Sequence, residues 1–257
     1  MVSSFKAFFK KEMIEGSRSY KFLILAIGIL FFAVLDPVTM KLLPVILKGQ
    51  FGALDFGSLI DISQRGVMAS HVKNLFQLST LVICFTLMGI IASEKTEKTL
   101  TIPVSMGGKL SAVIIGKWLL YTVYLSIIVI LGMTFTYFYA GTLFKFDFAN
   151  IYLVLKAGLI YSLFYSYVLS ALIMLSSLFR NSFISGITVL VTTYTMSGLG
   201  FLFPKISNFL PVNILDTANK FSDLNASDFY VSLLFTFLFI FLFLFVSIRK
   251  LSSDELV

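Results

Sequence analysis

The chain has few of the residues that soluble catalytic domains use most. Only 13% of its 257 residues are charged, and it contains a single histidine, His71, and a single cysteine, Cys84. One cysteine cannot form a disulfide within the chain, and one histidine cannot build a His-rich metal cluster. Soluble domains carry about 25% charged residues, so the shortage of charge excludes most classes of soluble enzyme.

Two kinds of catalytic motif are also missing from the sequence. The phosphate-binding pattern G-x-x-x-x-G-K-[ST] is absent, and its nearest fragments, Gly107-Gly108-Lys109 and Gly116-Lys117, lack the upstream glycine and the hydroxyl residue. Paired carboxylates and His-Glu pairs are absent from the apolar stretches, which argues against an intramembrane protease or acyltransferase. We therefore expect no enzymatic activity, no metal site and no cofactor bound by this chain.

Long apolar stretches make up most of the remaining sequence. Hydrophobic residues account for 58% of the chain, against about 45–50% in soluble domains. A membrane-spanning helix needs about 20 mostly apolar residues. The sequence predicts a single all-α, polytopic membrane domain over residues 1–257, whose six transmembrane helices lie at about 22–40, 74–93, 113–140, 156–179, 183–203 and 229–248.

The first of these spans must pass an acidic residue and a proline to be long enough. Only 14 residues separate Lys21 from Asp36, so the helix must continue past Asp36-Pro37 to Met40 to cross a bilayer. We expect Asp36, Lys156 and Arg180 to lie near span ends and to reach the interface by snorkelling. The resulting lack of buried charge argues against an ion channel or secondary transporter.

The distribution of lysine and arginine predicts the orientation. The net charge is +7, and one side of the predicted membrane carries more of the basic residues: Lys6, Lys10, Lys11, Arg18, Lys21, Lys95, Lys98, Lys109, Lys117, Arg180, Arg249 and Lys250. Lysine and arginine concentrate in cytoplasmic loops and contact anionic lipid. This pattern predicts a multi-pass protein of the cell membrane with both termini cytoplasmic, membrane lipid as a partner and no binding of nucleic acid.

Two segments outside the spans are expected to have structure. Residues 1–21 place Phe5, Phe8, Phe9 and Met13 on one helical arc, interrupted by Glu12, which predicts an interfacial amphipathic helix. Residues 37–73 form a long extracellular connection, which should hold local structure or a functional surface.

The most specific local feature is the predicted cytoplasmic loop over residues 93–117. It carries Glu-Lys-Thr-Glu-Lys-Thr at residues 94–99, Pro-Val-Ser at 103–105, and Lys117 at the start of the third span. With these motifs the chain resembles the permease subunits of type 2 ATP-binding-cassette transporters, in their compact six-span bacterial branch. Lys98 stands where that branch usually has glycine. Further short matches lie at residues 18–23, 43–47, 74–77 and 210–211.

The resemblance implies a partner and a set of contact residues. In this family two permease chains pair in the membrane, each docks on a cytoplasmic ATPase that binds ATP and Mg, and the ATPase drives export of a substrate. The implied ATPase contact consists of Phe8, Lys11, Glu94, Lys95, Glu97, Lys98, Thr99, Pro103, Val104 and Arg180. The polar part of the fifth span is expected to line the pathway or the seam between permeases, through Thr192, Thr193, Tyr194, Ser197 and Gly198, or to be ordinary helix packing through small and hydroxyl residues.

The implied function is the membrane subunit of an ATP-driven exporter that moves an amphipathic peptide, drug or lipid-like substrate outward. Two other functions stay open: a non-transporting membrane scaffold, sensor or immunity protein, and an ion-efflux permease. The sequence names neither the substrate nor the second permease chain, which is either an identical copy or a sister chain.

Overall fold

The computed structural model describes residues 2–51, 61–100, 109–146, 150–221 and 226–253, and the fold prediction is confirmed within them. All regular structure in these ranges is helical. Six helical segments have the length and apolar character to cross a membrane: Lys21–Ile46, Gln64–Thr96, Leu110–Phe144, Ile151–Leu178, Ser182–Leu202 and Phe229–Ser253.

Individual helices divide these segments as follows. The elements are α1 (Val2–Arg18), α2 (Lys21–Phe51), α3 (Gln64–Asn74), the π-helical turn η2 (Leu75–Ser79), α4 (Thr80–Leu87), α5 (Ala92–Thr96), α7 (Leu110–Phe144), α8 (Ile151–Leu178), α9 (Ser182–Leu202), α10 (Pro204–Ser207), the 3₁₀ turn η3 (Pro211–Asn213), α11 (Ile214–Lys220) and α12 (Ala226–Ser253).

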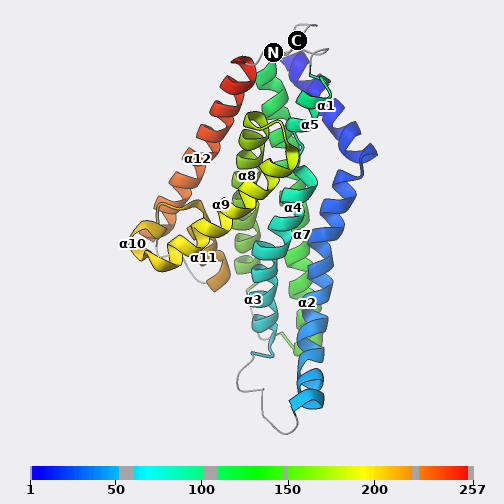
Figure 1. Cartoon of the computed structure of the whole chain (residues 1–257). Coiled ribbons are helices and arrows are strands. Elements are labelled where there is room, and N and C mark those ends of the chain that lie inside the picture. Colours follow the sequence, from blue (N-terminus) through cyan, green and yellow to red (C-terminus); the bar gives the residue numbers. More distant parts are fainter. Residues whose placement is uncertain (1, 52–60, 101–108, 147–149, 222–225, 254–257) are drawn as a thin grey trace.

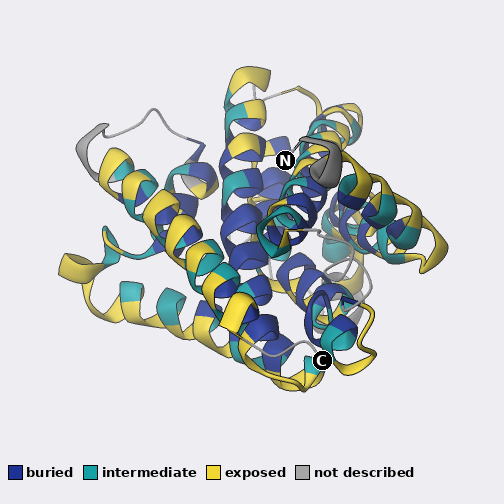
Figure 2. Ribbon diagram, turned by 90° about the horizontal axis from the view of Figure 1, so that it is seen from above, coloured by how far each residue is buried: buried dark blue, intermediate teal, exposed yellow. Residues whose placement is uncertain are grey.

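Helix α8 is the centre of the bundle. In its most apolar window 78% of the residues are buried, against 22–50% in the other five segments. It packs on α7, α12, α9 and α11, and the view from above shows dark, buried ribbon at the centre and exposed faces on the outer helices (Figure 2). The beginning of α1 and the end of α12 lie at one end of the bundle (Figure 1), which we call the termini end.

Helix α2 does not stop where the sequence predicted. It passes through Pro37 and Pro44 and continues to Phe51, and the next helix already begins at Gln64, so much of the predicted connection 37–73 is helical. A proline lacks the N–H that would bond the carbonyl four residues earlier. For Pro37 that carbonyl belongs to Ala33, and it accepts a hydrogen bond of 3.3 Å from the Thr136 hydroxyl of α7. Helix packing thus helps to compensate for the proline.

The end of α3 and the beginning of the π turn η2 are held by two tyrosines of α8. The hydroxyl groups of Tyr161 and Tyr165 on α8 donate to the carbonyl oxygens of Val72 and Leu75, each at 2.7 Å. The shifted hydrogen bonding of a π turn leaves main-chain groups without their usual partners, and buried carbonyls must be satisfied. These long-range bonds therefore fix the second span against α8.

The corner after the second span is a short helix with defined caps. The amides of Ile91 and Ala92 at the beginning of α5 donate to the Ser176 hydroxyl of α8, at 3.0 and 2.7 Å. At its other end the Thr99 amide bonds the Glu94 carbonyl and the Lys98 amide bonds the Lys95 carbonyl. This pair of bonds is a Schellman motif, which requires the left-handed conformation at its C′ residue. Lys98 supplies it, with φ of 56°.

The strain at Lys98 generates a first prediction. Replacing Lys98 by glycine should raise the free energy of unfolding by about 0.5–1 kcal/mol, because the left-handed conformation costs a non-glycine residue about 1–2 kcal/mol and glycine loses part of that gain in entropy. Thermal unfolding of the purified protein in detergent measures the change. The matched control is Glu97→Gly one residue earlier, where φ is −82° and glycine should destabilise; equal shifts for both variants would contradict the prediction.

Candidate functional site

The candidate site lies at the termini end, where α1 packs against α2 and the beginning of α7. The face of α1 that turns towards the bundle contains Phe8, Glu12 and Gly16, all buried, whereas Met13 and Ile14 are exposed. The sequence predicted an apolar arc that Glu12 interrupts. In the structure Glu12 belongs to the packing face, because a lysine lies opposite it.

That lysine is Lys117 of α7, and it is the centre of a network of ion pairs. Its ammonium group lies 2.7 Å from Glu12 Oε2 and 3.1 Å from Glu94 Oε2, with both partners buried. Lys11 contacts Glu94 and lies 3.2 Å from both Glu12 and Glu15. Lys21 completes the network at 3.1 Å from Glu15. Three ammonium groups therefore face three carboxylates.

Electrostatics in this network favour the charged forms. Burial acts to raise the pKa of Glu15, but the charges of Lys117, Lys21 and Lys11 outweigh it and lower the pKa to about 2. Burial likewise acts to lower the pKa of Lys11, and the carboxylates, led by Glu94, raise it above its ordinary value. Each group thus stabilises the charge of its neighbours, so the network joins α1, α5 and α7.

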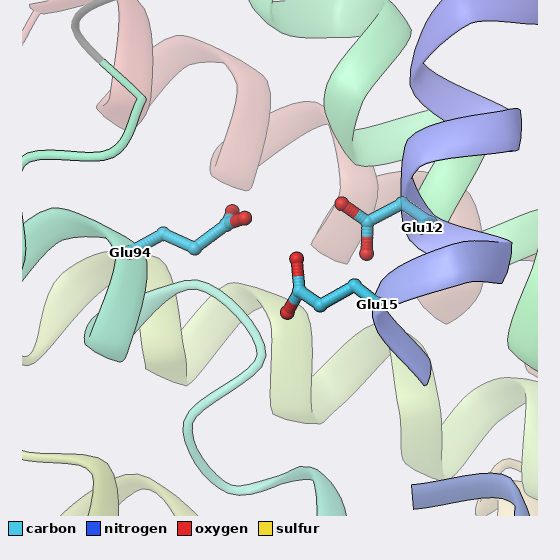
Figure 3. A group of neighbouring side chains, drawn as sticks. All are labelled: Glu12, Glu15 and Glu94. Atoms are coloured by element: carbon cyan, nitrogen blue, oxygen red, sulfur yellow. The ribbon is translucent and has the colours of Figure 1, made fainter. Parts of the chain in front are cut away.

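The three glutamates also have the spacing of a cation site. Carboxylate oxygens of Glu12, Glu15 and Glu94 lie within 4.8 Å of one another, and Figure 3 shows the three side chains converging, two from α1 and one from α5. However, the ammonium groups of Lys11 and Lys117 lie beside the same oxygens. Since the lysines balance the negative charge, the arrangement fits an internal ion network better than a metal centre.

Most of the residues expected at the ATPase contact lie at the termini end. They differ in how far their side chains are exposed. Phe8 and Glu94 are buried, Lys11 and Lys95 are partly buried, and Glu97, Lys98, Thr99 and Arg180 are exposed. Lys95 donates to the carbonyl of Ser177 at 2.7 Å, and Thr96 donates to the carbonyl of Arg180 at 3.4 Å. Pro103 and Val104 lie outside the described residues. The two predicted contact segments, the α5 corner and the turn at Arg180, are therefore adjacent.

The expected seam residues on α9 point in more than one direction. Thr193 is buried, and the Tyr194 hydroxyl donates to the carbonyl of Gln77 at 2.5 Å, so both contact their own chain. Thr192 and Gly198 are exposed and Ser197 is partly exposed. An added Cβ at Gly198 would meet no atom within 4 Å. Only part of the predicted set is thus available to a partner.

A second polar cluster was not predicted from the sequence. Asp36 is 2% exposed and does not reach the interface by snorkelling, which corrects that expectation. Its carboxylate oxygens lie 2.7 Å from His71 Nδ1 and 2.6 Å from Asn74 Nδ2. Among the described residues, the buried His71 Nε2 has no hydrogen-bond partner. The signal available in the sequence was an aspartate within an apolar helix together with the lone histidine.

Removing the central lysine should be costly. Lys117→Met leaves the buried Glu12 and Glu94 with Lys11 as their remaining cation, so the loss of stability should approach but not reach the about 3–5 kcal/mol that a buried charge without any partner costs. Expression level and melting temperature in detergent measure the loss. The double variant Glu12→Gln with Lys117→Met removes one charge of each sign and should recover part of it, while Lys10→Met at an exposed position of α1 is the matched control. If Lys117→Met were as stable as Lys10→Met, the ion network would not stabilise the fold and the prediction would be wrong.

The lowered pKa of Glu15 predicts a dependence on pH. Its ion pairs contribute stability fully above the ordinary pKa of 4.5, and this contribution is lost as the pH falls towards the folded-state pKa of about 2. Glu15→Gln should therefore lower the melting temperature at about pH 6 and by much less near pH 2.5. The exposed Glu97→Gln serves as the control, and a difference between wild type and Glu15→Gln that does not change with pH would refute the assignment.

Comparisons with known proteins agree with the membrane architecture. No protein-family model matches the chain. The chain is similar to a protein named "uncharacterized transmembrane protein YxlG" from Bacillus subtilis (strain 168), with 26% identity over 215 residues that cover 82% of each chain. Together with the six membrane-length helices, this similarity identifies a multi-pass membrane protein.

Proposed function

We propose that the chain is the membrane-spanning subunit of a type 2 ATP-binding-cassette exporter. In this proposal it docks on a separate cytoplasmic ATPase, pairs with a second permease chain, and moves an amphipathic substrate outward. It belongs to the cell membrane with both termini in the cytoplasm. ATP and Mg bind to the ATPase, and this chain carries out no chemistry of its own.

One observation carries the proposal: the exposed α5 corner rests on a rigid support. Its tip, with Glu97, Lys98 and Thr99, is exposed, while the residue at its base, Glu94, is tied to Lys11 and Lys117. A charged rim around a supported surface suits a partner of complementary charge. Force applied to this tip would pass through the ion network to α1 and to α7, two elements of the membrane domain.

The neighbouring turn extends the same surface. Arg180 lies beside α5, because its carbonyl oxygen accepts a hydrogen bond from the Thr96 hydroxyl. Lys10 and Arg18 of α1 are exposed at the same end of the bundle. Basic residues concentrated at one end favour the cytoplasmic side. The ATPase would therefore contact the α5 corner first and the Arg180 turn beside it.

Pairing with a second chain is supported by the outer face of α9. Besides Thr192 and Gly198, this helix exposes Val191, Leu199 and Leu202, which are 57%, 42% and 68% exposed. Small and hydroxyl residues allow close approach of helices in membranes. This face is mostly apolar and includes the exposed Thr192, a combination that suits an amphipathic cargo moving along the seam. The second chain can be either an identical copy or a sister chain.

The ion-efflux alternative gains support from a specific observation. The expectation that the spans contain no buried charge was wrong, because Asp36 of α2 and Lys117 of α7 are both buried. Ionisable groups inside a membrane domain often mark ion pathways. The pair of Asp36 and His71 is one such group. Ion flux that disappears in Asp36→Asn would favour this alternative over an exporter of amphipathic cargo.

Co-purification with an ATP-binding-cassette ATPase tests the proposal. The tagged chain, co-expressed with a candidate ATPase from the same genome and reconstituted in lipid nanodiscs, should retain that ATPase and change its turnover. The charge reversal Glu97→Lys with Lys98→Glu should weaken that association at least about tenfold, which corresponds to about 1.4 kcal/mol, without changing the melting temperature by more than a few degrees.

The matched control reverses a charge at a remote exposed site, Lys205→Glu on α10. Failure of the wild-type chain to retain any candidate ATPase would refute the proposal and favour a scaffold or sensor. Retention that is equal for all variants would move the contact away from the α5 corner.

A further inference from the structure

A groove between α7, α8 and α12 is separate from the ion network and from the α9 face. Its volume is about 640 Å³, within the range of ligand sites in proteins. The residues that line it are Ile115, Trp118, Thr122, Ser126, Ser162, Leu163, Ser166, Phe237, Ile240, Phe241, Leu244, Phe245 and Ile248. All belong to membrane-spanning helices.

The length of the groove matches the thickness of one leaflet of the bilayer. On α7 it extends from Ile115 to Ser126, and on α12 from Phe237 to Ile248. Eleven residues of helix rise about 17 Å, which is about half of a hydrocarbon core of about 30 Å. Because α7 begins and α12 ends at the termini end (Figure 1), the groove crosses the leaflet on that side.

The wall of the groove presents an apolar surface even where polar residues line it. The Ser162 and Ser126 hydroxyls donate to carbonyls of their own helices, each at 2.8 Å. Trp118 Nε1 donates to the Ser166 carbonyl at 3.3 Å, and the Thr122 hydroxyl lies 3.5 Å from the Ser166 hydroxyl. With these polar atoms engaged inside the protein, the groove suits a hydrocarbon chain better than a polar ligand.

Basic residues lie at the mouth of the groove. A second depression, of about 730 Å³, shares Phe245 and Ile248 with it and is also lined by Arg249 and Lys250. The Arg249 guanidinium lies 5.5 Å from the centre of the Phe245 ring, so it turns back towards the groove. An apolar groove of one-leaflet length that ends at two cations complements an anionic lipid.

We propose that this groove binds one anionic phospholipid, with an acyl chain between α7, α8 and α12 and its phosphate beside Arg249 and Lys250. The lipid belongs to the leaflet at the termini end. This site is independent of the proposed transport function, because it requires neither an ATPase nor a second permease chain. A bound lipid there would join α12 to α7, two helices that enclose the groove.

The chain provides its own probe for the test. Trp118 lines the groove and is the single tryptophan of the sequence, so its fluorescence reports on this site alone. The full chain is reconstituted in phosphatidylcholine vesicles that contain increasing amounts of lipid with brominated acyl chains, which quench tryptophan on contact. Brominated phosphatidylglycerol should reach half-maximal quenching at a mole fraction about three to five times lower than brominated phosphatidylcholine, as two nearby basic residues favour an anionic headgroup.

Two variants separate the headgroup from the acyl chain. Arg249→Gln with Lys250→Gln should abolish the preference and bring the ratio of the two mole fractions to about one, whereas the control Lys205→Gln, remote from the groove, should keep it. Ser126→Phe fills the deep end of the groove and should reduce the preference with both cations in place. Its hydroxyl bonds only its own helix, so the substitution leaves no buried partner without a bond.

Salt provides a measurement that needs no variant. Raising the ionic strength shortens the range of charge interactions and should reduce the preference of the wild-type chain for the anionic lipid. Equal quenching by both lipids in the wild type would overturn the proposal. So would a preference that persists in the Arg249→Gln, Lys250→Gln variant or remains unchanged in Ser126→Phe.

Discussion

The ion pair between Lys117 and Glu12 is the constraint on which the termini end of this protein depends. A lysine so deeply buried is stable only if carboxylates are fixed beside it, and both α1 and α5 are placed where they can supply them. The amphipathic helix is therefore part of the packed bundle, through its charged face as well as its apolar one. The positions of α1, α5 and α7 depend on one another, because displacement of any one would break at least one ion pair of the buried Lys117.

Much of the architecture could be predicted from hydropathy alone. The six spans follow from runs of apolar residues between charges, and the structure confirms them. The outer end of α2 could not be predicted in this way. Asp36 and Pro37 resemble a helix end in the sequence, but the Thr136 hydroxyl of α7 and the side chains of His71 and Asn74 supply the bonds that allow the helix to continue. These partners come from other helices, and local sequence contains no information about them.

The candidate site could also be predicted only in part from the sequence. Residues of the loop motif were found in the sequence, and the structure brings the α5 corner and the Arg180 turn together. Their individual exposure was not predictable, since Glu94 and Glu97 look equivalent in a charged loop. One is buried in an ion network and the other is exposed. The left-handed conformation of Lys98 was not predictable either, because a lysine rarely adopts a positive φ and nothing in the local sequence marks the position.

Helix α7 connects the ion network with the groove. At its beginning Lys117 belongs to the ion network under the α5 corner, and the next residue, Trp118, lines the groove beside α12. Adjacent positions on a helix point in different directions, so one turn of α7 contacts the α5 corner on one side and the groove on the other. Helix α7 is unbroken over 35 residues and has no proline at that point, so it places the ion network and the groove on two faces of one continuous helix.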